Sequence, residues 1–343
     1  MQLPTLIVKF SHKKPFEKMR ALIPVAGVGT RLRPHTYTLP KVLLNVGGKP
    51  IVGHIVDKLS NIGIKNISVV VGYMGDMVEE YLQTNYKANF KFIYQEERLG
   101  LGHATYVALS QDGNDEPLLI ILGDTVFDVD LSPLLKSKFS SIGVKRVEDP
   151  RRFGVAETAG DKVTKLIEKP DHPTSNLAVV GLYYIKSPKK LLAALQELID
   201  KNIKTKGEYQ LTDALQMMLD RGEVITFFEI DGWYDCGKPE TLLATNRHLL
   251  KKTKHFKKRD DVVIIPPVYI ADSAKISNSV IGPNATIDSD VTVVDSLIRD
   301  SIIGSGASIQ NALLEGSIVG QNAQLKGSFK RVNAGDSTEI DFS

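Results

Sequence analysis

The chain has 343 residues, which exceeds the size at which a single hydrophobic core usually stops growing, so two domains are expected. Its 43 lysines and arginines nearly balance its 40 aspartates and glutamates, and a net charge of +3 excludes a general electrostatic field for nucleic acid or an anionic membrane. An anionic ligand must therefore be bound at a local site. The single cysteine, Cys236, excludes an internal disulfide and a cysteine-rich zinc site, and is typical of a reducing cytoplasm.

The first eighteen residues combine a short apolar patch with scattered lysines and lack the small-residue cleavage site of a signal peptide. We therefore expect residues 1–18 to be an extension outside the fold, and Met19, just before the first clear strand, is an alternative start. No apolar run approaches the length of a membrane span. The expected location is the cytoplasm.

Strand-like and helix-like segments alternate from Arg20 to about Glu229. Between the first two strands, aliphatic side chains fall on one helical face, and similar stretches run from Asp76 and from Gly102. This βαβ series predicts an α/β domain over 19–250 with a Rossmann-like mixed, mostly parallel sheet covered by helices on both faces, and with ligands at the carboxyl ends of the strands. The runs that predict buried strands are RALIPV, NISVVVG, FKFIYQ and PLLIILGD, and the first helical face holds Ile51, Val52, Ile55, Val56, Leu59 and Ile62.

The character of the chain changes after Trp233. A predicted helix runs into a basic segment at 251–262, which we interpret as a solvated linker rather than a binding patch. Over 263–343 an aliphatic residue recurs every five or six positions, a spacing that fits the short rungs of a parallel β-helix better than a sandwich. We expect small residues at its corners. The aliphatic positions are 270, 276, 281, 287, 293, 298, 303, 309, 314, 319 and 325, and the small residues are Ala274, Ala285, Ala307 and Ala323.

The stretch PVAGVGTRLRP follows the first predicted strand. A glycine-rich turn at a strand end directs backbone N–H groups into one concavity that suits a phosphate, and Arg31 adds a delocalised positive charge. The spacing departs from both common nucleotide fingerprints, because Leu32 stands where a dinucleotide loop needs its third glycine and GGKP lacks the hydroxyl of a P-loop. Taken alone, the stretch predicts only a tight turn.

The longer run GVGTRLRPHTYTLPKVLLNVGGKP resembles the signature of sugar-1-phosphate nucleotidyltransferases. The resemblance covers 20–250 and includes long glucose-1-phosphate thymidylyltransferases, which have a C-terminal left-handed β-helix. The left hand of the β-helix is implied by the resemblance alone. Further motifs follow in the order and spacing of that family: YQEERLGLGHA, LGDTVFD, EDPRRFGVAE, LIEKP, SNLAVVGLYY, KGEYQLTDAL and GWYDCGKPETLLATNRHLL.

The resemblance implies that a sugar-1-phosphate oxygen attacks the α-phosphorus of a nucleoside triphosphate, giving a nucleotide-sugar and pyrophosphate. Because two polyanions must meet, the site needs cations and no nucleophilic side chain. By resemblance, Arg31 holds the leaving part of the triphosphate, Lys41 contacts the phosphates near the reacting centre, and Lys169 binds the sugar phosphate. Asp124 and Asp235 are the expected ligands of Mg²⁺, which prefers carboxylates together with substrate phosphates.

The remaining site residues are also expected from the matched motifs. The nucleotide is expected at the loop residues Ala26, Gly27, Gly29 and Thr30, while Gln95 offers a planar amide to the imide edge of a pyrimidine and Gly100 lets the base lie flat. His103 is either a ligand contact or an ordinary helix-start histidine. The expected sugar-binding residues are Gly154, Glu168, Asn176 and Gly181.

Several alternatives stay open at this point. Motif resemblance favours dTTP, PVAG and GLGHA favour UTP, and glucose 1-phosphate is the favoured sugar. Guanylyl transfer to mannose 1-phosphate and a non-catalytic regulatory subunit are the runner-up functions. An acyltransferase is disfavoured because His255, the last of the seven histidines, precedes the repeat. The β-helix is expected to support a homo-oligomer or a regulatory platform, because its terminal rungs and flat faces need cover.

Overall fold

The computed structural model describes residues 19–252 and 256–328. The predicted extension at 1–18, part of the predicted linker and the last fifteen residues of the chain lie outside the described residues. The described residues form two compact units, one of 19–44 with Lys49–Thr241, and the other of Asn45–Gly48 with 242–252 and 256–328. No helix in 19–252 or 256–328 is long and apolar enough to cross a membrane.

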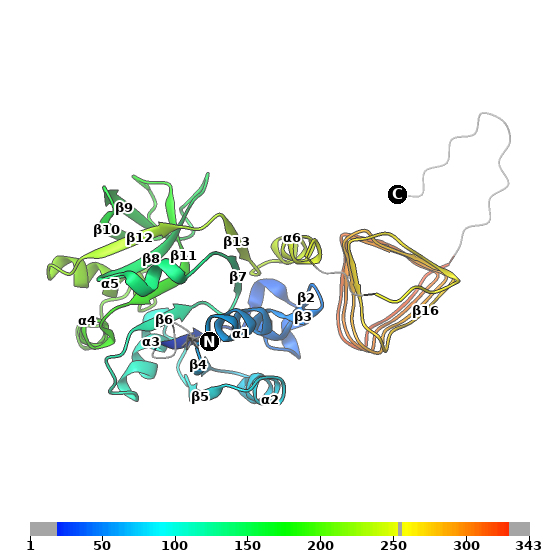
Figure 1. The fold of residues 1–343 in the computed structure, drawn as a ribbon, viewed down its shortest axis with the longest axis horizontal. Coiled ribbons are helices and arrows are strands. Elements are labelled where there is room, and N and C mark those ends of the chain that lie inside the picture. The colour runs from blue at the N-terminus through cyan, green and yellow to red at the C-terminus, as the bar shows by residue number, and fades with distance from the viewer. Residues whose placement is uncertain (1–18, 253–255, 329–343) are drawn as a thin grey trace, which may run out of the picture. The chain divides into compact units, whose positions relative to one another are not determined.

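The first unit is built on a nine-stranded mixed sheet (Figure 1). Four strands form its parallel half, and the other half contains mainly antiparallel pairs. The four predicted apolar runs form the parallel strands, which confirms the βαβ reading of this region. In sheet order the strands are β5 (Asn89–Tyr94), β4 (Asn66–Val71), β1 (Arg20–Pro24), β6 (Leu118–Ile121), β11 (Leu177–Ile185), β8 (Ser140–Arg146), β12 (Ile225–Glu229), β10 (Lys162–Glu168) and β9 (Gly154–Ala159).

Five helices complete the described part of this unit, and the three helices expected from the apolar periodicity are among them. In α1 (Ile51–Ile62) the predicted apolar face is buried except for Ile62, which is half-buried, and the helix is capped by Gly63, whose φ of 94° suits a residue without Cβ. The helices α3, α4 and α5 pack against one another and against the sheet in one hydrophobic cluster. The helices are α1 (Ile51–Ile62), α2 (Gly75–Asn85), α3 (Leu101–Ser110), α4 (Pro188–Asp200) and α5 (Leu211–Asp220).

The strand order places a switch point at the middle of the parallel half. The chain passes from β1 through α1 to β4 on one side, whereas β6 pairs with the other side of β1. In open α/β sheets, the loops that diverge at such a point leave a crevice beyond the carboxyl ends of the strands. The two predicted motif loops, which follow Pro24 and Ile121, lie at this crevice.

Two short antiparallel ribbons and four 3-10 turns carry four of the predicted site residues, namely Thr30, Arg31, Lys41 and Asp235. One ribbon pairs β7 (Thr125–Asp128) with β13 (Gly232–Asp235), and the other pairs β2 (Asn45–Val46) with β3 (Lys49–Pro50). The turns are η1 (Thr30–Leu32), η2 (His35–Tyr37), η3 (Lys41–Leu43) and η4 (Ser132–Lys136).

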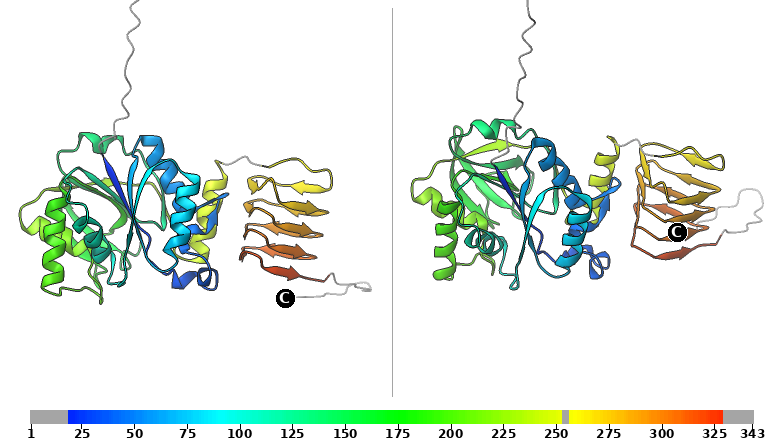
Figure 2. Two further views of the ribbon diagram at one scale, coloured as in Figure 1. Left: turned by 90° about the horizontal axis from the view of Figure 1, so that it is seen from below. Right: turned by 60° about the horizontal axis from the view of Figure 1, so that its bottom comes forward.

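Most of α6 (Pro239–Leu250) and the repeat belong to the second unit, in which three parallel ladders of four short strands form the sides of a β-helix (Figure 2). Successive coils pair in register, as in the inward column Ile276, Val293, Ile309 and Leu325. The ladders are β14 (Val262–Ile264), β17 (Ser279–Ile281), β20 (Leu297–Arg299) and β23 (Leu313–Glu315); β15 (Val268–Ile270), β18 (Ala285–Ile287), β21 (Ile302–Ile303) and β24 (Ile318–Val319); and β16 (Lys275–Ser277), β19 (Thr292–Val294), β22 (Ser308–Gln310) and β25 (Gln324–Lys326).

Three of the four alanines expected at corners of the β-helix do close turns, because the N–H groups of Ala274, Ala307 and Ala323 donate to the carbonyls of Ala271, Gly304 and Gly320. Ala285 differs from the expectation, since it lies inside β18. The bends are made by residues with positive φ, mainly asparagine and aspartate, whose short polar side chains tolerate the left-handed conformation. These residues are Asn278, Asn284, Asp290, Asp295, Asp300, Asn311 and Asn322, together with Gly282, Gly306 and Gly316.

Candidate active site

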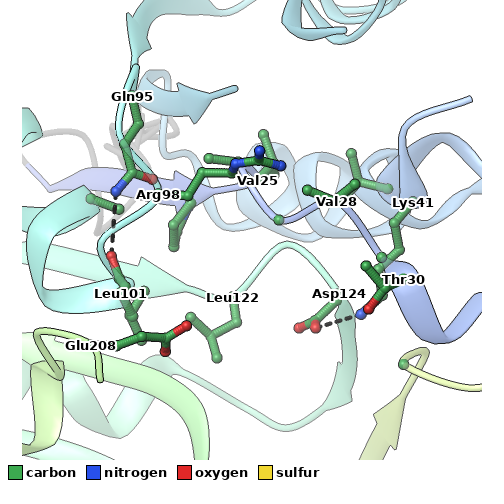
Figure 3. A pocket seen from close by; sticks show the side chains of 18 of the residues that line it. Val25, Val28, Thr30, Lys41, Gln95, Arg98, Leu101, Leu122, Asp124 and Glu208 are labelled. Atoms are coloured by element: carbon green, nitrogen blue, oxygen red, sulfur yellow. Dashed lines mark hydrogen bonds and ion pairs between the residues drawn. The ribbon is translucent and has the colours of Figure 1, made fainter. Parts of the chain in front are cut away.

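A cavity of about 580 Å³ opens at the carboxyl ends of β1, β5 and β6 (Figure 3). Its wall contains the loop from Pro24 to Arg31, the segment after β5 with Gln95 and Arg98, and the end of β6 with Asp124. This is the place that the strand order predicts for a ligand. The cavity therefore brings together the predicted phosphate loop and the predicted base-binding segment.

The loop after β1 is held in place by contacts on both sides. The Val25 N–H donates to the Val70 carbonyl at 2.7 Å, and the Thr36 hydroxyl donates to the Gly29 carbonyl at 2.8 Å. Gly29 has a φ of 67°, and a Cβ there would lie 2.9 Å from Cβ of Lys41. A Cβ at Gly27, by contrast, would meet no atom within 4 Å. Packing thus requires glycine at 29, whereas 27 is open to a ligand.

Lys41 and Asp124 form a close ion pair at the wall of the cavity. Lys41 begins η3 and its side chain is 8% exposed, yet its Nζ lies 2.6 Å from Oδ2 of Asp124. Burial by itself raises the pKa of Asp124, but the Lys41 ammonium and hydrogen bonds from Lys41 and Thr125 hold that pKa below its ordinary value. Asp124 is therefore an anion with a fixed cationic neighbour.

Asp235 is brought beside Asp124 by the β7–β13 ribbon. The register pairs Asp235 with Thr125, and the Cys236 N–H donates to the Asp124 carbonyl at 2.9 Å. Burial and the Asp124 carboxylate raise the pKa of Asp235, while Lys41 and Arg31 oppose the rise. Two carboxylates whose pKa values are moved in opposite directions are common at functional sites.

A second cavity of about 440 Å³ shares Arg31, Leu122 and Asp124 with the first. Asp235 and Gly181 also line it, which places four predicted site residues around this second space. The guanidinium of Arg31 and the carboxylate of Asp235 both approach Gly237, where an added Cβ would lie 2.9 Å from each. Arg31 and Asp124 thus stand at the boundary between two neighbouring cavities, and Asp235 lies in the wall of the second.

Gln95 is buried in the wall of the first cavity. Its Nε2 lies 2.9 Å from Nδ1 of His103 and donates to the Gly100 carbonyl at 3.4 Å. With the His103 proton on Nε2, both hydrogens of the Gln95 amide are used, and Oε1 remains as an acceptor. His103 therefore positions Gln95. Gly100 has a φ of 107°, and a Cβ there would lie 2.6 Å from the Tyr209 carbonyl, so packing alone requires this glycine.

The predicted sugar-side residues separate into different places. Glu168 accepts a hydrogen bond from the Thr212 hydroxyl at 2.7 Å, and Gly154 packs against both side chains. Lys169 Nζ lies 3.3 Å from Oε1 of Glu168. This group of residues at the ends of β9 and β10 does not line either cavity described above.

Asn176 lies in yet another place. Its side chain accepts a hydrogen bond from Arg146 at 3.3 Å, and it lines a third cavity of about 720 Å³. Gly181 is the sugar-side residue that the structure brings to Asp124 and Asp235. Its φ is 82°, and a Cβ there would meet the Leu122 side chain at 2.6 Å.

Sequence reasoning missed several residues of these walls. Arg98 and Glu208 line the first cavity, where Figure 3 shows both side chains together with Gln95. Trp233 and Lys238 line the second cavity. All four stand inside motifs that the sequence analysis quoted, so the motifs were a usable signal. Nothing in their spacing indicated that these side chains face a cavity.

The donor set fits a magnesium ion that is shared with substrate. Among the described residues no group of three or more histidine, cysteine, aspartate or glutamate side chains could hold a metal. Asp124, directly before β7, and Asp235, at the end of its partner β13, supply two hard oxygen donors. Mg²⁺ is commonly bound by one or two carboxylates, with phosphates and water completing its shell.

Comparison with known proteins gives a consistent result. Residues 20–252 match the family model described as nucleotidyl transferase. Low-salt glycan biosynthesis nucleotidyltransferase Agl11 from Haloferax volcanii is 34% identical over 340 residues, covering 84% of this chain and 93% of that protein. Glucose-1-phosphate thymidylyltransferase from Streptomyces griseus is 31% identical over 321 residues, covering 84% of this chain and 88% of that protein.

Two further matches are partial in length. Bifunctional protein GlmU from Methanocaldococcus jannaschii is 36% identical over 262 residues, which cover 75% of this chain but only 61% of GlmU. A crystal structure of UDP-glucose pyrophosphorylase with UDP-glucose is 28% identical with a TM-score of 0.61, covering 68% of this chain and 99% of that one. The similarity to Agl11 thus covers a larger share of this chain than either of these two matches does.

Proposed function

The chain belongs to the nucleotidyl transferase family, and from this premise we propose that it transfers a uridylyl or thymidylyl group from UTP or dTTP to glucose 1-phosphate. The general activity, that of a sugar-1-phosphate nucleotidyltransferase without a specified nucleotide or sugar, follows from the family and its relatives. The observation that carries the proposal is the pair of cavities that meet at Arg31 and Asp124. One cavity would hold the nucleotide and the other the sugar phosphate.

Electrostatics explains why the boundary is charged. Two like unit charges about 4 Å apart repel by roughly 4 kcal/mol at an effective dielectric near 20, so the esters need cations where they meet. Arg31 stands at the boundary and Lys41 stands beside Asp124. Lys41 would hold the α-phosphate in line with the attacking oxygen, and Arg31 would bind the leaving pyrophosphate. Lys169 remains the proposed ligand of the sugar phosphate.

Asp124 and Asp235 would hold Mg²⁺, which when bound supplies charge neutralisation at the phosphates. The protein's own part is the geometry. The β7–β13 register fixes the two carboxylates together, and Lys41 keeps Asp124 ionised. This arrangement positions the ligands before substrate arrives, which reduces the reorganisation required during reaction.

The hydrogen bonds of Gln95 support a base with an N–H on its pairing edge. Because His103 and the Gly100 carbonyl occupy the Gln95 amide hydrogens, Oε1 is left to accept from the imide N3–H of uracil or thymine. Cytosine and adenine present a ring nitrogen without hydrogen at this edge. Uracil and thymine differ by one methyl group, which is worth only about 1–3 kcal/mol of discrimination.

The substrate assignment is tested by measuring pyrophosphate release from five nucleoside triphosphates with several sugar 1-phosphates, with and without Mg²⁺. We expect UTP and dTTP with glucose 1-phosphate to give the highest kcat/KM, and CTP and ATP to react poorly. GTP also presents a ring N–H, so guanylyl transfer to mannose 1-phosphate is the alternative that this experiment decides. A preference for ATP or CTP would contradict the proposed role of Gln95.

The metal assignment is tested by the variant Asp124→Asn. We expect turnover to fall by at least about a hundredfold, because the amide is neutral and binds Mg²⁺ poorly while keeping the size of the side chain. The matched control is Asp161→Asn, the same change at an exposed aspartate outside both cavities. Mg²⁺ dependence, kcat and the melting temperature would be measured for both. Full activity of a folded Asp124→Asn protein would remove the metal assignment.

The β-helix also supports a proposed homo-oligomer. One outer column consists of four aliphatic residues in register, namely Val263, Val280, Leu297 and Leu313. Val263 is 58% exposed and Leu313 is 78% exposed. Exposed aliphatic side chains in such a column form an apolar patch, and patches of this kind commonly mark a contact surface with another protein. Acyl transfer stays disfavoured, because the sequence has no histidine after His255.

A further inference from the structure

The Gly47–Gly48 turn of the β2–β3 hairpin is tightly enclosed. Both glycines have positive φ, 60° and 90°, so this turn has little conformational preference of its own. A Cβ at Gly47 would lie 2.7 Å from Cβ of Leu249, and a Cβ at Gly48 would lie 2.3 Å from the ring of Tyr269. Because of such contacts, the hairpin residues 45–48 belong to the second unit.

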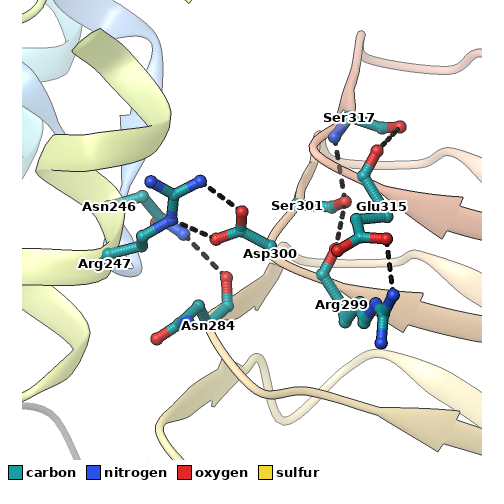
Figure 4. A network of polar contacts seen from close by, with 8 residues as sticks. All are labelled: Asn246, Arg247, Asn284, Arg299, Asp300, Ser301, Glu315 and Ser317. Atoms are coloured by element: carbon teal, nitrogen blue, oxygen red, sulfur yellow. Dashed lines mark hydrogen bonds and ion pairs between the residues drawn. The ribbon is translucent and has the colours of Figure 1, made fainter. Parts of the chain in front are cut away.

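Asn246 is the polar centre of this contact. The residue is completely buried in α6, and its Oδ1 accepts from the Gly47 N–H at 2.8 Å and from the Thr286 hydroxyl at 2.6 Å. Its Nδ2 donates to the Asn284 carbonyl at 3.2 Å (Figure 4). One side chain thus fixes the hairpin to α6 and to two positions of one coil. A second hydrogen bond, from Nδ2 of Asn45 to Asp288 at 2.9 Å, supports the hairpin independently.

The base of the same hairpin is joined to Lys41. The Ile51 N–H, just after β3, donates to the Leu44 carbonyl at 3.1 Å, and the Leu44 N–H donates to the Lys41 carbonyl at 3.1 Å. Leu44 directly precedes β2. The backbone of Lys41 is therefore tied through one residue to both ends of the hairpin, and its side chain forms the 2.6 Å pair with Asp124.

We propose that Asn246 is a positioning residue for Lys41, acting through the Gly47–Gly48 turn. Without the acceptor at 246, the buried Gly47 N–H loses its partner and the glycine turn regains its freedom. The greater freedom of the turn extends along the hairpin backbone to η3, and the ion pair between Lys41 and Asp124 becomes less well ordered. The effect on turnover rests on the function proposed above, whereas the effect on Lys41 itself does not.

The test compares Asn246→Ala with Arg247→Ala in the full-length protein. Arg247 is the next residue of α6 and pairs with Asp300 of the coils, but among the described residues it has no hydrogen bond or ion pair with the hairpin, so it serves as the matched control (Figure 4). Two quantities would be measured in each folded variant. The first is the rate at which Lys41 is methylated by formaldehyde and borohydride, followed by peptide mass spectrometry. The second is kcat together with KM for both substrates.

We expect Asn246→Ala to raise the Lys41 methylation rate and to lower kcat by about 3- to 10-fold, the range of one lost hydrogen bond, with smaller changes in KM. Arg247→Ala should leave Lys41 methylation unchanged. Unchanged Lys41 methylation in folded Asn246→Ala overturns the proposal, as does an equal rise in Arg247→Ala. If no sugar nucleotide is formed by the wild-type protein, the methylation rates still decide the positioning role while the proposed function fails.

A second pair of variants applies if Asn246→Ala does not fold. Gly48→Ala introduces a methyl group against the Tyr269 ring, whereas Gly48→Ala combined with Tyr269→Ala removes that clash. The backbone strain of alanine at a φ of 90° is common to both variants, so their difference does not contain that strain. We expect faster Lys41 methylation in the single variant than in the double variant. Equal rates in the two overturn the proposal.

Discussion

At the scale of single residues, the pair formed by Gln95 and His103 links the proposed base recognition to pH. Burial lowers the pKa of His103 below its ordinary 6.5, although Glu97 opposes the change. The unfolded chain therefore takes up this proton at a higher pH than the folded protein, and His103 contributes a loss of stability as pH falls below 6.5. Protonated His103 also cannot accept from the Gln95 amide at Nδ1.

We therefore expect affinity for UTP or dTTP to fall on the acid side of pH 6.5, the ordinary pKa of His103. The variant His103→Gln, which offers an acceptor that does not titrate in this range, should show a flatter profile. Nucleotide dissociation constants measured between about pH 5 and 8 for both proteins check this, since titration of the nucleotide is common to both. Identical profiles would contradict the role given to His103.

The two loop glycines separate packing from ligand access. Gly29→Ala places a Cβ 2.9 Å from Lys41 at a φ of 67°, so we expect a loss of stability of about 1–2 kcal/mol together with lost turnover. Gly27→Ala meets no protein atom within 4 Å, so its stability should stay within about 0.5 kcal/mol of wild type. Its KM for the nucleoside triphosphate should nevertheless rise. Urea unfolding and steady-state kinetics distinguish these outcomes, and an unchanged KM in Gly27→Ala would argue against phosphate at this loop.

At the scale of elements, the β7–β13 ribbon decides where the carboxylates meet. A Cβ at Gly232 would lie 2.4 Å from Cβ of Asp128, its partner across the ribbon. We expect Gly232→Ala to push the strands apart and to raise the Mg²⁺ concentration needed for half-maximal activity. Asp128→Gly combined with Gly232→Ala removes the clash and should recover much of the Mg²⁺ response. Titrations of activity with Mg²⁺ test this, and no recovery in the double variant would mean that the ribbon does not set the metal site.

At the scale of the whole molecule, the faces of the β-helix differ in what covers them. On one face Thr286 and Ile302 are buried, and Thr286 is bonded to Asn246 of α6. On another face, mainly polar side chains such as Gln310 occupy the outward-facing positions of the strands. The remaining face presents the aliphatic column of Val263 and Leu313 to solvent. This contrast favours the last face as the contact surface of the homo-oligomer proposed above.

We expect Leu313→Asp to lower the mass of the particle in analytical ultracentrifugation, because a charge buried without a partner opposes association. Gln310→Asp, on the polar face, is the matched control and should keep the wild-type mass. The melting temperature of each variant shows whether the coils remain folded. Equal masses for all three proteins at the same concentration would remove the proposed interface.

The sequence by itself determined the alternation of strands and helices, the β-helix repeat and the motif segments that line the cavities. Each depends on local periodicity or on residues close together in the chain, because apolar spacing directly reflects which side chains face a core. The positions of the glycines were also visible in the sequence, but the packing contacts that require glycine at those positions were not. Gly100 and Gly154 are required by packing against the Tyr209 carbonyl and the Thr212 side chain.

The tertiary structure alone decided which distant residues share a wall. Asp124 and Asp235 meet because β7 and β13 pair in one register, and no pattern within either segment encodes that register. The same applies to Asn176, which the fold places in a separate cavity, and to Asn246, whose partners come from a hairpin and a coil far away in the chain. Long-range pairing depends on the packing of the complete core, so a single sequence without its fold leaves it open.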